Sequence, residues 1–144
     1  MDAIEISRNL VINFIGDIWN NNHFDKMDNY LHADFTDHSL PPGLSADKEG
    51  LRRWIADTGM SFEHRSIIEE QVTEANKSMI KLRLFLKHIG VWRTLQPTGI
   101  ELSVVGYRYF KIHEGKILEH WALFDGNAIE NQLKDAAHGC KIQE

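Results

Sequence analysis

The chain has a single cysteine, Cys140, among its 144 residues. One thiol cannot form an internal disulfide, and it cannot supply the several thiolates of a structural metal cluster. Because Cys140 lies in a polar C-terminal tail, we expect it to be a free surface thiol. A chain of this length is long enough to bury a hydrophobic core, so we expect that core to hold the fold together.

Positive charge and long apolar runs are also scarce. The formal net charge is −5 at pH 7, and no stripe of Lys and Arg marks a phosphate-binding face, which argues against nucleic acid as a partner. No apolar run approaches the roughly 20 residues of a membrane-spanning helix. The N-terminus, MDAIEISRN, is acidic where a signal peptide would be basic and then apolar. We therefore predict a soluble, cytoplasmic protein without a membrane role.

Neither a change in composition nor a repeat divides the chain, so residues 1–144 are predicted to form one domain. In the first part of the chain, apolar residues recur at the spacing of amphipathic helices. We predict one helix that the run Asn20-Asn21-Asn22 ends, a shorter helix over 24–31, and a third that follows the loop Pro41-Pro42-Gly43.

From Ser61 onward the apolar period changes to two, which is typical of strands. We predict strands over 62–73 and 79–91, a hairpin around the turn Glu114-Gly115, and a short closing helix over 127–133. Helices followed by an antiparallel meander of about four long strands indicate an α+β fold, with the helices packed on the inner face of a curved sheet. A ligand pocket is expected at the open end of such a fold.

The hairpin register decides which side chains face the core. A two-residue turn at Glu114-Gly115 pairs His113 with Lys116, because Gly adopts positive φ without steric cost. Continued without interruption, the register sets Arg108 opposite Trp121, on the face that also carries the apolar core residues. We therefore expect Arg108 to point inward beside an aromatic ring.

The same face carries Glu119 and Asp125, so three charged side chains are predicted to point inward. Buried charges are costly unless they are paired or line a cavity where they meet a ligand. Alternation sends His120 to the outer face, whose half-apolar character indicates a subunit interface. The sequence therefore predicts an inward constellation of Arg108, Trp121 and Asp125.

Three segments carry a resemblance to a known family: FTDHSLPPGLSADKEGLRRWI, QPTGIELSVVGYRYFKIHEGKILEHW and FDGNAIENQL. Together with the order of helices and strands, they resemble the SnoaL-like polyketide cyclases, within the NTF2-like superfamily of cone-shaped α+β folds. The resemblance implies an enzyme without a cofactor that closes a ring by intramolecular aldol condensation, or that carries out related lyase or isomerase chemistry. It also implies a homodimer or larger homo-oligomer packed through the outer sheet face.

Where the family has an acid/base carboxylate, this chain has Asp125. A carboxylate desolvated in an apolar pocket suits proton transfer to and from carbon. The alternative is that Asp125 caps the helix that begins near Asn127. Arg108 could stabilise an enolate oxygen or bind a ligand carboxylate, or it could form a structural ion pair with Glu119.

Two histidines could donate a proton to a substrate carbonyl. His88 ends an apolar row of its strand, and His38 lies just before the proline-rich loop. A histidine on an apolar face is more often a satisfied core residue, so that alternative stays open for both. We predict Asp125, His88 and Arg108 as catalytic residues. The residues predicted to contact substrate are His38, Trp121, Glu119, Trp54 and Phe35.

The side chains of His32, Asp34, Asp37 and His38 would suit zinc or a similar ion. They lie in a loop that leaves a helix and lack the helical spacing of a familiar motif, so we predict no metal site and no cofactor.

Two functions from different classes are compatible with these features. The first is a cofactor-independent acid/base enzyme of cyclase type that acts on a small hydrophobic carbonyl compound, with Asp125 as base and Arg108 or His88 polarising the carbonyl. The alternative is a domain that binds a small hydrophobic molecule without turnover. An oligomerisation module with a filled cavity is a third possibility, because a fold does not by itself determine a function.

Overall fold

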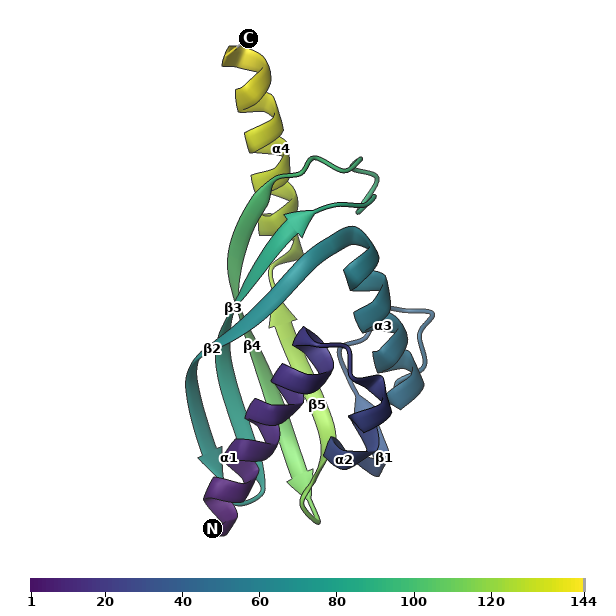
Figure 1. Cartoon of the computed structure of the whole chain (residues 1–144), viewed down its shortest axis with the longest axis vertical. Helices are drawn as coiled ribbons and strands as arrows, with labels where there is room; N and C mark the ends of the chain where they lie inside the picture. Colours follow the sequence, from purple (N-terminus) through teal and green to yellow (C-terminus); the bar gives the residue numbers. More distant parts are fainter. Residues whose placement is uncertain (144) are drawn as a thin grey trace.

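The computed structural model describes the backbone of residues 1–143 and the side chains of residues 1–136, so the prediction for the Cys140 thiol lies outside the described side chains. Helices pack on one side of a curved sheet, and α4 projects from one end of the molecule (Figure 1). The helices are α1 (Ala3–Phe14), α2 (Met27–Tyr30), α3 (Lys48–Ser61) and α4 (Gly126–Gln143), with a π-helical turn η1 (Ile15–Asn20) and a 3-10 turn η2 (Phe24–Lys26). The strands are β1 (Leu31–Asp37), β2 (Phe62–Glu74), β3 (Lys77–His88), β4 (Glu101–His113) and β5 (Lys116–Phe124).

The strands form one sheet in the order β1-β5-β4-β3-β2. β1 runs parallel to β5, and the other neighbours are antiparallel. The predicted α+β class, with helices on the inner face of a curved sheet of long strands, is confirmed. The closing helix is longer than the prediction over 127–133, since α4 begins at Gly126 and continues to Gln143. Within residues 1–143, no helix has both the length and the apolar composition that crossing a membrane requires.

β1 is a strand that the sequence did not reveal. The helix predicted over 24–31 ends one residue early, because Leu31 already belongs to β1. From Leu31 to Thr36 β1 advances five residues, while its partner β5 advances only two, from Ile117 to Glu119. The extra residues bulge away from β5 and interrupt the period of two, which hides the strand from a search for alternation.

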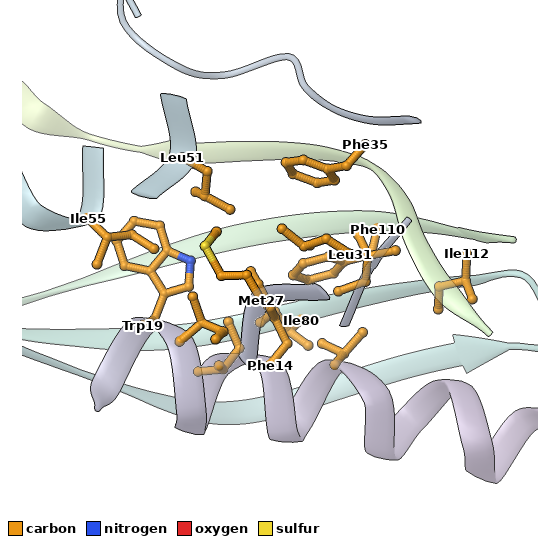
Figure 2. Packing of buried hydrophobic residues seen from close by; sticks show 14 of the residues in the cluster. Phe14, Trp19, Met27, Leu31, Phe35, Leu51, Ile55, Ile80, Phe110 and Ile112 are labelled. Carbon is orange, nitrogen blue, oxygen red and sulfur yellow. The ribbon is translucent and has the colours of Figure 1, made fainter. Parts of the chain in front are cut away.

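The main core lies between the first helix and the inner face of the sheet (Figure 2). α1 begins where Asp2 accepts a hydrogen bond from the backbone N–H of Glu5 at 2.8 Å. Phe14 of α1 packs edge-on against Phe110 of β4, with ring centroids 6.0 Å apart, and both side chains are buried. Apolar residues recur about every 3.6 positions in the helix and every two positions in the strands, so each element has one apolar face. These two faces pack against each other.

Phe110→Ala empties the centre of this core and is expected to lower the free energy of unfolding by about 3–5 kcal/mol. Lys111→Ala changes the next residue of β4, whose side chain is exposed on the outer face, and should stay within about 0.5 kcal/mol of the wild type. Urea denaturation followed by circular dichroism measures both. Equal losses would show that β4 does not present these residues to opposite faces.

Candidate functional site

A bulge at Leu118 decides which residues of the hairpin face the core. The pairing begins as predicted and holds to Ile112 opposite Ile117, but Lys111 then pairs with Glu119, which leaves Leu118 without a partner. An extra residue in one strand reverses the faces of all residues that follow it. The predicted register is therefore wrong beyond the bulge.

The bulge exchanges His120 and Trp121 between the two faces of the sheet. His120 is buried, with 3% of its surface exposed, and Trp121 no longer lies opposite Arg108. Trp121 and Glu119 lie on the outer face, where the ring of His38 stacks on Trp121 at 4.4 Å and its Nε2 atom lies 2.9 Å from Oε1 of Glu119. The predictions of an outward His120, an inward Trp121 and an inward Glu119 are wrong.

Asp125 follows the last residue of β5, and its side chain is exposed. Its carboxylate accepts a hydrogen bond from the backbone N–H of Ala128 at 3.0 Å, so it caps the first turn of α4. The prediction that Asp125 points into the core is therefore wrong, and its contacts are those of the helix-capping alternative.

Asp37, His120 and Arg108 form a buried chain of polar contacts. The Nδ1 atom of His120 lies 2.9 Å from Oδ2 of Asp37, and its Nε2 atom lies 3.3 Å from Nη1 of Arg108. Because a guanidinium can only donate, Nε2 must accept, and the proton of the neutral ring must be on Nδ1, which donates to Asp37. A neutral imidazole thus joins a carboxylate to a guanidinium.

Strand pairing places Asp37 beside His120. Asp37 is the last residue of β1 and the partner of His120 on β5, and the backbone N–H of His38 donates to the His120 carbonyl at 2.9 Å. The backbone N–H of Ser39 donates to Oδ1 of Asp37 at 2.9 Å, and the hydroxyl of Ser39 accepts from the N–H of Ala122 at 2.7 Å. The backbone therefore holds one carboxylate oxygen while His120 holds the other.

The protonation states follow from this arrangement. Burial lowers the pKa of His120 below 6.5, and the charge of Arg108 adds to this effect against the opposing effect of Asp37. Burial alone would raise the pKa of Asp37, but the hydrogen bonds from His120 and Ser39 and the charge of Arg108 outweigh it and bring the pKa below 3.8. Burial lowers the pKa of Arg108 to about 10, so it stays charged at neutral pH. The site thus holds one negative and one positive charge.

The guanidinium of Arg108 lies over two aromatic rings, 4.1 Å from the centroid of Trp19 and 5.0 Å from that of Phe124. Trp19 belongs to η1, and π-helical turns are frequent at functional sites. The side chain of Asn20 fixes this turn by exchanging two hydrogen bonds with the backbone of Ser66 on β2, at 2.8 and 3.0 Å. β2 thus fixes the turn that carries Trp19, and β5 carries Phe124, so two strands hold the aromatic rings beside Arg108.

Arg108 lines a cavity of about 430 Å³ whose walls include five aromatic side chains. Among the described residues that line it, Asp57 of α3 is the one carboxylate, and Arg93, from the loop before β4, is a second cation. The Nε atom of Arg108 is buried and has no hydrogen-bond partner within the described part of the chain. A guanidinium with a buried, unpaired donor at the wall of a cavity favours a ligand with an anionic or carbonyl oxygen. The aromatic lining residues are Trp19, Trp54, Phe62, Trp92 and Phe124.

The cavity contains only part of the predicted site. Arg108 and Trp54 line it. His88 is fully buried with its Nδ1 atom 3.0 Å from the hydroxyl of Thr98, and it is not among the lining residues, so its position is that of a core histidine. Phe35 is buried in the main core, with 4% of its surface exposed.

Reasoning from the sequence misses or misplaces four residues of this site. The sequence does not single out Trp19 or Asp57, alternation alone places His120 on the wrong face, and Asp37 is a candidate only in the metal-binding alternative. One local signal of the bulge exists, because the consecutive apolar residues Ile117-Leu118 break the alternation of β5. Nothing local relates Asp37 to His120, since the two lie 83 positions apart.

A comparison with protein families matches residues 9–133 to the SnoaL-like polyketide cyclases. Among solved structures, TsrD from Streptomyces laurentii superposes with a TM-score of 0.78 at 20% sequence identity, covering 90% of this chain and 95% of that chain. IdmH from Streptomyces antibioticus superposes with a TM-score of 0.79 at 18% identity, covering 88% and 97%. A SnoaL-like polyketide cyclase from Agrobacterium tumefaciens reaches a TM-score of 0.72 at 17% identity, covering 88% and 96%. No curated protein matches the chain. At these identities the solved structures show a shared fold.

The buried chain makes stability depend on pH. The pKa of His120 in the folded state lies below 6.5. Below pH 6.5 the unfolded state therefore binds a proton more readily than the folded state does. The free energy of unfolding is at its full value above pH 6.5 and falls as the pH drops below it. Asp37 adds a further loss when the pH falls below 3.8 and its carboxylate is protonated. Urea denaturation at about pH 7.5 and about pH 5.5 should show a lower free energy of unfolding at the lower pH.

His120→Gln keeps one donor for Asp37 and one acceptor for Arg108 but does not titrate, so it should reduce this loss of stability. His23→Gln replaces an exposed histidine and serves as the control. If both variants keep the full pH dependence, His120 is not the group that causes it.

Proposed function

Because this chain belongs to the SnoaL-like polyketide cyclase family, we propose that it is a cofactor-independent acid/base enzyme that acts on a small hydrophobic carbonyl compound in the cavity beside Arg108. The observation that carries the proposal is a buried guanidinium that lies against an aromatic cavity and retains an unpaired donor. A fixed positive charge in a desolvated site stabilises an oxygen that becomes negative during a reaction.

Arg108 fills the role of oxyanion stabiliser. When a proton leaves the carbon next to a carbonyl, the electron pair moves to the carbonyl oxygen and forms an enolate. The guanidinium donates hydrogen bonds to that oxygen, while His120 and Asp37 hold its orientation from behind and balance its charge. His120 and Asp37 do not line the cavity, so they act as positioning residues.

Asp57 is the proposed general base. Asp57 lines the cavity from α3, its side chain is 46% exposed, and its nearest ionic partner, Arg53, lies at 4.0 Å. In an aldol cyclisation Asp57 takes the proton from carbon, the enolate carbon attacks a second carbonyl of the same molecule, and the resulting alkoxide takes a proton back from Asp57. This role replaces the one predicted for Asp125, which caps α4 outside the cavity.

The alternative is a domain that binds a hydrophobic anion without turnover. It is favoured by one observation, namely that five aromatic rings line the cavity together with two cations, while a single carboxylate lines it among the described residues. Such a lining is sufficient for binding by stacking and charge alone. In that case a ligand found by thermal-shift screening would remain chemically unchanged over time.

We also propose that two copies of the chain pair through the outer face of the sheet. Tyr109 stacks on Trp121 with ring centroids 5.4 Å apart, and Met79 is the strand partner of Tyr109 on the other side. Met79, Tyr107 and Leu123 have 48%, 45% and 72% of their surfaces exposed. Apolar side chains that continue across neighbouring strands favour a self-complementary interface.

Arg108→Gln is expected to lower kcat/KM for a polycyclic or β-dicarbonyl substrate by about 10²–10³-fold, the cost of losing an oxyanion donor. Asp57→Asn should lower kcat by about 10²–10⁴-fold through loss of the base. Asp125→Asn, which still caps a helix, should leave both constants unchanged. The measurement is product formation by chromatography, with circular dichroism to verify folding. A folded Asp57→Asn variant with full activity would eliminate Asp57 as the base.

Light scattering after size-exclusion chromatography is expected to show a dimer for the wild type. Replacing both Tyr107 and Leu123 by Asp should give monomers, because it buries two charges in the proposed interface. Ile6→Asp changes an apolar residue of α1 that is also exposed, at 46%, and should leave the dimer intact. A monomeric wild type, or equal dissociation by Ile6→Asp, would contradict an interface on this face.

A further inference from the structure

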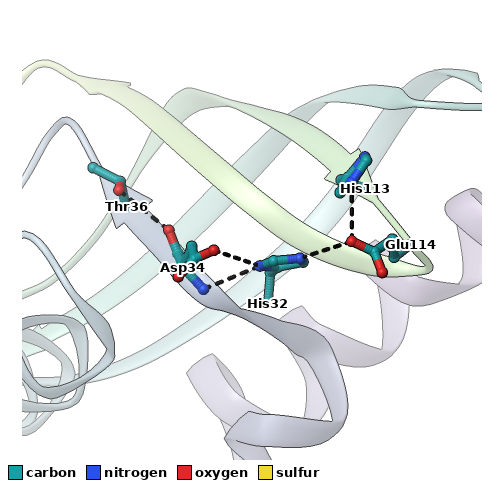
Figure 3. A network of polar contacts seen from close by, with 5 residues as sticks. All are labelled: His32, Asp34, Thr36, His113 and Glu114. Carbon is teal, nitrogen blue, oxygen red and sulfur yellow. Dashed lines mark hydrogen bonds and ion pairs between the residues drawn. The ribbon is translucent and has the colours of Figure 1, made fainter.

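Two histidines and a glutamate meet at the tip of the β4–β5 hairpin, at the end of the molecule opposite α4 (Figures 1 and 3). The Oε1 atom of Glu114 lies 3.0 Å from Nε2 of His113 and 3.4 Å from Nε2 of His32. One ligand atom from each of the three residues lies within 4.8 Å of the others. None of these residues lines the cavity beside Arg108.

Two irregular pieces of backbone bring these residues together. Glu114 and Gly115 form the tight turn of the hairpin, with φ values of 53° and 73°, so the Glu114 side chain projects from the tip. β1 lies beside β5, and its bulge after Leu31 turns His32 toward this tip. His32 and Glu114 are 82 positions apart, and only the parallel pairing of β1 with β5 makes them neighbours.

We propose that this cluster is a binding site for a divalent metal ion of the zinc class, with Nε2 of His32, Nε2 of His113 and a carboxylate oxygen of Glu114 as ligands. Zinc binds such atoms at about 2.0–2.2 Å, so tetrahedral ligands lie about 3.3 Å apart. The distances from Oε1 of Glu114 to Nε2 of His113 and of His32, 3.0 and 3.4 Å, already match that spacing. Two imidazoles favour zinc, nickel or copper over magnesium and calcium, which prefer oxygen ligands.

The Asp34 carboxylate lies close enough to His32 to give the outer support that a metal-binding histidine usually has once an ion is bound. Its backbone N–H donates to Nδ1 of His32 at 3.0 Å, so in the free protein the proton of a neutral His32 ring is on Nε2. Metal binding at Nε2 requires the proton on Nδ1, so the hydrogen bond from the Asp34 N–H breaks, and Nδ1–H can then donate to the Asp34 carboxylate, which lies 4.0 Å away and is almost fully exposed. A short movement of this side chain completes a carboxylate–histidine–metal arrangement.

The local charge favours a cation as well. Among the described residues, Asp34 and Glu114 have only histidines as ionic partners, and no lysine or arginine neutralises either carboxylate. The side chains of His113 and Glu114 are 61% and 70% exposed, which gives an ion access from solvent. Since the ion binds the folded chain, it should stabilise that state by an amount that rises with the logarithm of the ion concentration above Kd. This site does not depend on the proposed function.

Isothermal titration of the metal-free full chain with Zn²⁺ alone tests the proposal, with thermal unfolding as a second readout. We expect one ion per chain and a rise in melting temperature that grows with Zn²⁺ concentration. Glu114→Gln and His113→Asn each remove a ligand and should weaken binding by about 100-fold, and Asp34→Asn by about tenfold. Mg²⁺ at the same concentration should give no such rise.

Glu119→Gln is the matched control, because Glu119 also faces a histidine, His38 at 2.9 Å, but without a third ligand. It should bind Zn²⁺ as tightly as the wild type. Absence of binding, or equal weakening by Glu119→Gln and Glu114→Gln, would overturn the site. Wild-type affinity in the Asp34→Asn variant would overturn the outer support by Asp34.

Discussion

Two opposite charges buried in one sheet, those of Asp37 and Arg108, organise this structure through the neutral ring of His120 between them. Each charge has lost its water, and either one alone would be strongly destabilising. Joined, they cross three neighbouring strands and tie β1 to β5 and β4. The same arrangement leaves the guanidinium against aromatic rings at the wall of a cavity, where its charge can serve a ligand.

One unpaired residue makes this arrangement possible. With Leu118 as an extra residue, β5 turns His120 inward to Arg108 and turns Trp121 outward to Tyr109 and His38. Without the bulge, a tryptophan would stand where the histidine now joins the two charges. Bulges of this kind re-aim side chains at the cost of a locally disrupted ladder.

β1 contributes a residue to each of the two polar networks. Its last residue, Asp37, balances Arg108, and its second residue, His32, lies at the hairpin tip beside Glu114. The bulge between these two positions separates a regular pairing with β5 from a segment that projects polar side chains. A short strand with an irregular register thus connects a buried polar network to the exposed one that Figure 3 shows.

Local periodicity was sufficient to predict the α+β class, the tight turn and the inward direction of Arg108, because each depends on neighbours within one element. β4 alternates without interruption from Val104 to Ile112, so Arg108 faces the core in either register of the hairpin. The sequence did not reveal which way His120 points, since a single extra residue reverses every later face. It also did not bring Asp37 to His120, because that contact requires β1 to lie beside β5, and only the packing of the whole chain decides the order of strands in a sheet.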